Sequence, residues 1–207
     1  MKTWKVVVLI LALLGIAAGG VGWRTWREVF GAGPSFPEGD RFVLIPTGST
    51  FDQVVDSLKT GGILEDDHAF RLLAERKNYV ERIKPGRYRV PSRSSLNVLV
   101  NTLRSGEQEP LDLTFTNVDD LPELAGRVSR YLEADSVAFL RAFMDRGLQQ
   151  EAGLNERNFI SLFIPNTYEM WWTTTPQQFI ARMVKEHSAF WTDERKAKAI
   201  HYGLEPW

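Results

Sequence analysis

A sequence pattern occurs twice in the middle of the chain, with the second copy 45 residues after the first. This repeat constrains the fold more than any other feature of the sequence. In the first copy the stretch 41–45 (RFVLI) ends at Pro46, Ser49 follows, and apolar residues then recur with helical spacing until Gly61. The second copy repeats these positions without a gap at Val90, Pro91, Ser94, Leu96, Leu99, Val100, Leu103 and Gly106. A strand that leads into a capped amphipathic helix, used twice, predicts an α+β module rather than a solenoid, which needs three or more repeats.

The residues between the two copies complete this module. We expect Ser49 to cap the first helix, with Asp52 in the capping-box position. Asp66 or Asp67 is expected to cap a further helix between the copies. The predicted module covers residues 41–108, with its helices packed on a short sheet.

The N-terminal segment has the composition of a membrane span. Residues 6–21 are an unbroken run of apolar residues and glycine, flanked by Trp4 and Trp23. As an α-helix this segment is about 28 Å long, close to the hydrocarbon thickness of a bilayer, and tryptophan favours both membrane interfaces. We therefore predict a cytoplasmic tip and transmembrane signal anchor over residues 1–23, with the rest of the chain outside. The alternative is a cleaved signal peptide, because lysines precede the run and small residues end it.

The last third of the chain indicates a second α+β domain. It follows a Pro- and Gly-rich linker at 24–40 and the duplicated module, and covers residues 109–207. Alternating apolar residues predict a half-buried strand at 111–115. Three later positions are N-caps before amphipathic helices: Asp120, Asp135 and Thr175. A further helix start at Glu205-Pro206 stands directly before the last residue, so we expect this domain to be incomplete.

Composition and charge exclude several classes of function. The chain has no cysteine, which excludes disulfide scaffolds, thiol nucleophiles and iron–sulfur sites. Its 25 Lys and Arg are balanced by 26 Asp and Glu, so no positive excess indicates nucleic acid. No phosphate-binding loop, dinucleotide fingerprint or nucleophile elbow occurs, and His68, His187 and His201 lie far apart. We therefore expect neither a cofactor nor a metal.

One acid differs from the others in its sequence surroundings. Glu169 lies in the aromatic stretch Tyr168–Trp172, which we expect to be a loop after a Pro165-Asn166 turn. Burial among aromatic side chains raises the pKa of a carboxyl and suits it to general-acid catalysis. Glu169 is therefore the candidate catalytic residue of this chain, although no partner acid is visible beside it.

Three stretches, taken in order, resemble the membrane-anchored endolytic murein transglycosylases, the MltG or YceG-like family. They are 42–62 (FVLIPTGSTFDQVVDSLKTGG), 83–106 with Lys-Pro-Gly-Arg-Tyr at 84–88, and 163–169 (FIPNTYE). The resemblance implies a LysM-like domain at 41–108 and the first part of a YceG-like catalytic domain at 109–207. Pro165, Asn166, Thr167, Tyr168 and Glu169 correspond to the Pro-Asp-Thr-Tyr signature of the family and are implied to bind substrate. Asn166 stands where the family usually has aspartate.

The resemblance also implies where the catalytic residue lies. In the family, a Gly-Leu-x-Pro segment opens the helix that carries the catalytic glutamate, and Gly203–Pro206 matches this opening. The glutamate is then expected beyond Trp207, and this chain would be inactive as it stands. For the complete protein the resemblance implies cleavage of the MurNAc–GlcNAc bond in nascent peptidoglycan. One glutamate would leave 1,6-anhydro ends and terminate strand elongation without a metal or cofactor.

The same resemblance implies the partners and the location. The partners are peptidoglycan glycan strands and the membrane, with peptidoglycan synthases or division proteins as further candidates, and no nucleic acid. The location is the bacterial cytoplasmic membrane, with one span and the bulk of the chain on the extracytoplasmic side. The alternative function is a membrane-tethered glycan-binding or division scaffold without catalysis.

Overall fold

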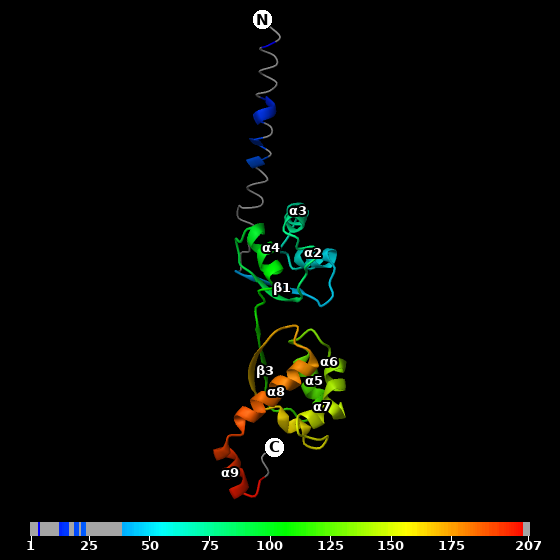
Figure 1. Cartoon of the computed structure of the whole chain (residues 1–207), viewed down its shortest axis with the longest axis vertical. Coiled ribbons are helices and arrows are strands. Elements are labelled where there is room, and N and C mark those ends of the chain that lie inside the picture. The colour runs from blue at the N-terminus through cyan, green and yellow to red at the C-terminus, as the bar shows by residue number, and fades with distance from the viewer. Residues whose placement is uncertain (1–3, 5–12, 17–18, 21, 24–38, 205–207) are drawn as a thin grey trace. The chain divides into compact units, whose positions relative to one another are not determined.

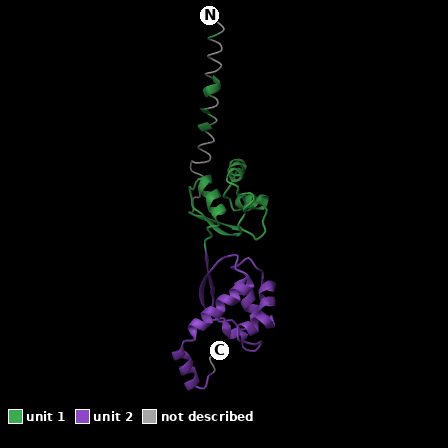
Figure 2. Ribbon diagram, viewed as in Figure 1, with its two compact units in different colours: residues 1–109 green, residues 110–207 purple. Residues whose placement is uncertain are grey.

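The computed structural model describes residue 4, residues 13–16, 19–20 and 22–23, and residues 39–204. The anchor and linker predicted over residues 1–40 fall mostly outside this range and stay predictions. Among the residues described, none of the helices has the length and hydropathy that a membrane span requires. The chain divides into two compact units between Glu109 and Pro110 (Figure 2).

Over residues 39–109 the first unit is a two-stranded antiparallel sheet with α2 and α4 packed on it and α3 packed against α4 (Figure 1). Its elements in chain order are β1 (Arg41–Ile45), α2 (Phe51–Thr60), α3 (His68–Arg76), β2 (Gly86–Val90) and α4 (Leu96–Ser105). The register places Arg41 opposite Val90 and Ile45 opposite Gly86. Alternate strand residues such as Val43 and Tyr88 are buried with the apolar faces of the helices, so one face of the sheet forms the core.

Both helices that follow a strand in this unit begin one residue later than predicted. Thr50, not Ser49, is the N-cap of α2: its Oγ1 accepts from the Gln53 backbone N–H, and Gln53 Oε1 accepts from the Thr50 N–H. Ser95 rather than Ser94 caps α4, where its Oγ accepts from the Val98 backbone N–H at 3.3 Å. The backbone N–H of Ser49 instead donates to the Pro46 carbonyl at 3.2 Å and closes the turn. The prediction was wrong because adjacent Ser and Thr residues are equally able to cap, and only the turn decides between them.

The second unit is a second two-stranded sheet with a larger helical layer. Its elements are β3 (Leu111–Phe115), α5 (Leu121–Val128), α6 (Ser136–Phe143), α7 (Arg146–Glu151), the 3-10 turn η1 (Phe159–Leu162), β4 (Asn166–Met170), α8 (Pro176–Phe190) and α9 (Asp193–His201). β3 and β4 are antiparallel, with Leu111 opposite Met170 and Phe115 opposite Asn166. Phe179 of α8 lies at the centre of the core. Its ring is 5.7 to 6.5 Å, between centroids, from those of Phe115, Phe139, Phe143 and Phe163. The predicted α+β class is confirmed.

The strand–turn–helix order that the sequence shows twice occurs four times in the structure. In each case the N-cap follows the last strand residue by five positions: Thr50 after Ile45, Ser95 after Val90, Asp120 after Phe115, and Thr175 after Met170. In three of the four turns, the N–H just before the N-cap donates to the residue just after the strand, at 3.0 to 3.2 Å. In all four helices the residues four, five and eight positions after the N-cap are buried, so the second pair follows the same pattern. The strands of the second pair end 55 residues apart rather than 45, and Thr116 and Trp171 stand where the first pair has prolines, so the sequence comparison missed it.

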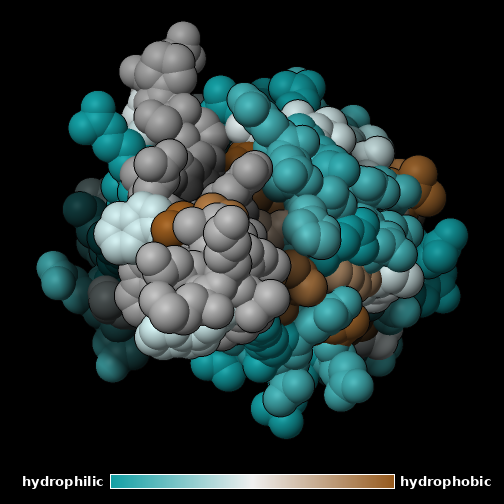
Figure 3. Space-filling view, turned by 90° about the horizontal axis from the view of Figure 1, so that it is seen from above, coloured by the Kyte–Doolittle hydropathy of each residue, from teal (hydrophilic) through white to brown (hydrophobic). Residues whose placement is uncertain are grey.

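Figure 3 shows one face of the molecule coloured by the hydropathy of its residues. On the described part of that face hydrophilic residues predominate, and hydrophobic residues show only as small separate areas. Single exposed hydrophobic side chains are normal in soluble proteins.

Candidate functional site

The second sheet presents four polar side chains on its solvent side. Because side chains alternate along a strand, Leu113, Phe115, Tyr168 and Met170 enter the core and Asp112, Thr114, Thr167 and Glu169 are exposed. The register places Asp112 directly opposite Glu169. It also places Thr114 opposite Thr167, with their Oγ1 atoms 2.8 Å apart. We call these four exposed residues the outer face of the second sheet.

The five residues predicted to bind substrate, Pro165 to Glu169, do not act as one group. Pro165, Asn166 and Thr167 line a shallow hollow of about 440 Å³ beside Thr114, Phe115, Thr116 and Asn117. Tyr168 is buried on the opposite side, where its ring stacks on Phe115 with centroids 5.5 Å apart. Its hydroxyl donates to the Ile164 carbonyl, and burial raises the pKa of the phenol. Tyr168 therefore holds the strand in place, and the other four residues are accessible.

Glu169 is not the buried loop acid that the sequence predicted. It lies in β4, and the alternation that turns Tyr168 and Met170 into the core turns Glu169 to solvent. The predicted turn at Pro165-Asn166 is also wrong in part, since Asn166 is the first residue of that strand. The spacing of Tyr168 and Met170 is the sequence signal for this exposure, but it assigns the two faces only once residues 166–170 are known to form a strand.

A second hollow, of about 290 Å³, lies where β4 ends and α8 begins. Its lining residues are Pro110, Glu169, Met170, Trp171, Thr174, Gln178 and Arg182, and we call it the Trp171 hollow. Trp171 is 50% exposed at its edge. Arg182 donates through Nε to Glu186 at 2.6 Å, and Gln178 Oε1 accepts from the Thr175 N–H at 2.9 Å. The sequence analysis did not find Trp171, Gln178 or Arg182, because they converge only when β4 pairs and α8 docks.

A third hollow, of about 600 Å³, borders Thr114 from the side of α5. Its lining residues are Thr114, Glu123, Gly126, Arg127, Arg130 and Tyr131. Arg127 donates to Glu123 at 2.6 Å and to Thr116 Oγ1 at 2.9 Å. The Asp119 backbone N–H and Arg127 hold the pKa of the Glu123 carboxyl below its usual range. An ionised acid thus compensates one of the two arginines of this hollow.

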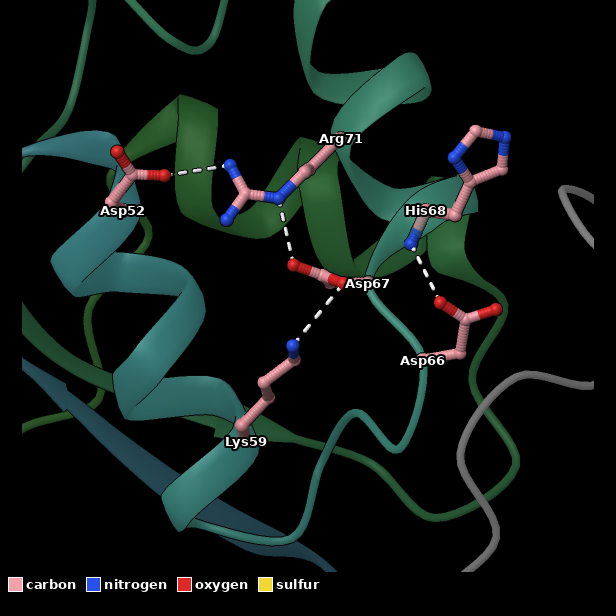
Figure 4. A network of polar contacts seen from close by, with 6 residues as sticks. All are labelled: Asp52, Lys59, Asp66, Asp67, His68 and Arg71. Carbon is pink, nitrogen blue, oxygen red and sulfur yellow. Dashed lines mark hydrogen bonds and ion pairs between the residues drawn. The ribbon is translucent and has the colours of Figure 1, made fainter.

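The charged network of the first unit ties α2 to α3 (Figure 4). Asp67 accepts from Arg71 Nε at 2.7 Å and pairs with Lys59 Nζ at 3.2 Å, while Arg71 also pairs with Asp52 at 2.7 Å. Arg71 and Lys59 hold the pKa of the Asp67 carboxyl below its usual range. Each carboxylate of this cluster thus has a cation beside it, which indicates a role in joining the helices. Within the described ranges no three potential metal-ligating side chains cluster.

The three histidines stay apart in the structure. His68 on α3 is exposed, and its backbone N–H donates to Asp66 Oδ1 at 3.0 Å; Asp67, the other predicted cap, makes no such bond. His187 on α8 accepts from Trp191 Nε1 at 3.2 Å, and burial lowers the pKa of its imidazole. His201 is exposed at the end of α9. These side chains lie on three different helices and do not form a common site.

No aspartate or glutamate side chain in the described part of the chain is buried. Tyrosines apart, Gln149 is the one buried polar side chain there, and its Nε2 donates to the Phe143 carbonyl. The outer face and its hollows carry exposed acceptors, donors and one indole, which are groups that can bind a polar ligand.

One of three comparisons with known proteins agrees with the resemblance seen in the sequence. A family model described as the YceG-like family matches residues 43–206. A search of curated proteins finds no significant match. Among solved structures, a crystal structure of a yceG-like protein from Listeria monocytogenes is 16% identical, with a TM-score of 0.43. The alignment covers 82% of this chain and 60% of that one, so this chain spans less than two thirds of that protein.

Proposed function

This chain belongs to the YceG-like family, and from that premise we propose that it is part of a membrane-anchored endolytic murein transglycosylase of the MltG type. The match of residues 43–206 to the family model carries the proposal, and it confirms the family predicted from the sequence. The substrate would be the nascent peptidoglycan strand. The predicted anchor at residues 1–23 would hold both units at the extracytoplasmic surface of the membrane.

The proposed reaction needs one carboxyl group. In its acid form this group gives its proton to the glycosidic oxygen as the bond from MurNAc C1 to that oxygen breaks. The resulting carboxylate then takes the proton of the sugar's own 6-hydroxyl while O6 attacks C1. One C–O bond breaks, another forms, and no water is consumed, which leaves a 1,6-anhydro end. Hydrolases that use two carboxylates differ, because their second acid activates water or attacks the sugar.

We assign glycan binding to the second unit and place the catalytic carboxyl outside residues 39–204. The assignment rests on the exposed acceptors and donors of the outer face and on the absence of a buried acid among the described residues. The family pattern that begins at Gly203 would place the glutamate on the helix after Pro206. The first unit, in the position of a LysM-like domain, would bind or position the strand. Peptidoglycan synthases and division proteins are the further partners we propose.

Incubating glycan strands with the 207-residue chain tests whether this chain binds glycan without cleaving it. We expect strands to co-sediment with the chain, and mass spectrometry to detect no 1,6-anhydro ends above a protein-free control. Anhydro products formed by this chain, and lost in Glu169→Gln, would contradict our placement of the acid and make Glu169 the catalytic residue. Failure to bind any strand would contradict the glycan assignment itself.

A second function, a membrane-tethered glycan-binding scaffold, is favoured by one observation. The described residues include no buried carboxyl that could serve as a general acid. The full open reading frame separates the two functions. A protein made from it that binds strands and never forms anhydro ends is a scaffold, whereas anhydro products identify the transglycosylase.

A further inference from the structure

The residue directly after each strand occupies the same place in all four strand–turn–helix units, and Trp171 is the exception among them. The four residues are Pro46, Pro91, Thr116 and Trp171, and all four are exposed. Three are small or polar, so the turn does not need a large apolar side chain at this position. The indole of Trp171 is half exposed, so it forgoes about half of the stabilisation that full burial would bring. Folding therefore does not explain why a tryptophan stands there.

The backbone that carries Trp171 is fixed on both sides. Its carbonyl accepts from the Thr174 N–H at 3.0 Å, and the carbonyl of Trp172 accepts from the Glu133 N–H at 2.9 Å. Before it, Met170 pairs with Leu111 in the sheet, and after it the capping box of Thr175 begins α8. A rigid backbone reduces the ordering cost when the indole meets a ligand. The backbone of Trp171 is therefore already ordered before any ligand binds.

The rim of the Trp171 hollow is polar and carries both acceptors and donors. Glu169 offers carboxylate oxygens, Thr174 a hydroxyl and Gln178 an amide. Arg182 uses Nε for Glu186, and its two terminal nitrogens have no hydrogen-bond partner among the described residues. The equivalent hollow of the first unit has Gln53 at the position of Gln178 but lacks an aromatic residue. The combination of indole, carboxylate and guanidinium is therefore specific to the second unit.

We propose that the Trp171 hollow is a glycan subsite, in which the indole of Trp171 stacks on the apolar C–H face of one sugar ring. The ring's equatorial hydroxyl and acetamido groups would meet Glu169, Gln178 and Arg182 at the rim. A purely apolar ligand would match the indole but leave these polar groups unpaired, which is unfavourable. The proposal rests on the proposed function for its ligand class and adds the residues that would bind that ligand.

Indole N–H signals in NMR spectra of the full 207-residue chain test the subsite directly. The chain has seven tryptophans, and the signal missing from Trp171→Ala identifies Trp171. We titrate with a peptide-free GlcNAc–MurNAc tetrasaccharide and expect this signal to shift saturably. In isothermal titration calorimetry with the same tetrasaccharide, Trp171→Ala should weaken binding about tenfold or more, and Trp171→Phe, which keeps an aromatic face, by about threefold. Tyr202→Ala is the matched control, because Tyr202 is an exposed aromatic residue of the same unit outside the hollow.

Two results would overturn the subsite, and they can be told apart. If the tetrasaccharide shifts signals elsewhere while the Trp171 indole stays in place, the hollow is not a subsite and the proposed function is untouched. If neither the tetrasaccharide nor long glycan strands change any signal, the glycan assignment fails together with the subsite. Circular dichroism of each variant verifies that the fold is retained.

Discussion

The sheets of the two units are built alike inside and differ outside. Each is a pair of five-residue antiparallel strands in which the first residue of one strand faces the last of the other. Each buries a tyrosine at the third position of the second strand, Tyr88 or Tyr168. Its hydroxyl donates to the carbonyl four residues earlier, that of Lys84 or Ile164, directly before a proline. The same hydrogen bond, from a buried tyrosine to the carbonyl before a proline, therefore holds both second strands in place.

The outer faces of the two sheets carry opposite chemistry. In the first sheet the exposed positions hold Phe42 and Leu44 opposite Arg89 and Arg87, and the Arg87 guanidinium lies 3.6 Å from the Phe42 ring centroid. The second sheet has Asp112 opposite Glu169 and the threonine pair. Like charges directly opposite each other destabilise a sheet, whereas a cation over an aromatic ring is favourable. The scaffold thus tolerates very different outer faces, and the acid pair is better explained by binding than by folding.

The largest effect is expected from the two core residues at the fourth position of the helices that follow β2 and β4. Phe179→Ala should cost about 3–5 kcal/mol and Leu99→Ala about 2–5 kcal/mol, because both side chains are buried. Residues 39–109 contain no tryptophan, whereas Trp171, Trp172 and Trp191 lie in the second unit. In urea, the tryptophan fluorescence transition should therefore move to lower denaturant in Phe179→Ala. Leu99→Ala should leave the midpoint of this transition unchanged. If Leu99→Ala lowers the midpoint as much as Phe179→Ala does, the two units unfold together and cannot be compared as independent units.

Replacing each of the three buried tyrosines by phenylalanine should change the free energy of unfolding by an amount that depends on whether its hydroxyl has a hydrogen-bond partner. Tyr88→Phe and Tyr168→Phe each lose a hydrogen bond to a carbonyl and should lower the free energy of unfolding by about 1 kcal/mol. The Tyr79 hydroxyl is buried and has no hydrogen-bond partner within the described structure. Tyr79→Phe should therefore be neutral or stabilising by up to about 1 kcal/mol. Circular dichroism melts of the three variants measure this, and a loss in Tyr79→Phe equal to the other two would contradict it.

The smallest effect should come from the outer faces themselves. Asp112→Asn removes the repulsion across β3 and β4 and should raise stability by about 0.2–1 kcal/mol. Phe42→Ala removes the ring beneath Arg87 and should lower stability by about 0.5–1 kcal/mol. Concentrated salt screens exposed charges, so the gain in Asp112→Asn should shrink in 1 M NaCl. A gain that does not change with salt would show that repulsion is not its cause.

The features that the sequence determined by itself are local. The strand at 111–115 alternates strictly, and Thr175 with Pro176 and Gln178 forms the predicted helix start, with the capping box present in the structure. These signals involve residues within a few positions of one another, so neighbouring side chains and backbone groups suffice to produce them. The errors were local ambiguities, such as Ser49 beside Thr50, where two residues could cap and the turn chose one.

Only the tertiary structure decided which side chains form the candidate site. The stretch 166–170 became a strand because β3 was available to pair with it, and that pairing turned Glu169 to solvent, whereas the sequence analysis had placed it in an aromatic loop. The Trp171 hollow joins Pro110 at the start of the unit to Arg182 in its longest helix. Whether such distant residues come together depends on which apolar faces pack against each other. The hydrophobic effect is non-directional and scales with the apolar area buried, so the sequence pattern of one element does not specify which other element it packs against. The local elements were therefore readable from the sequence, whereas the binding surface came only from their assembly.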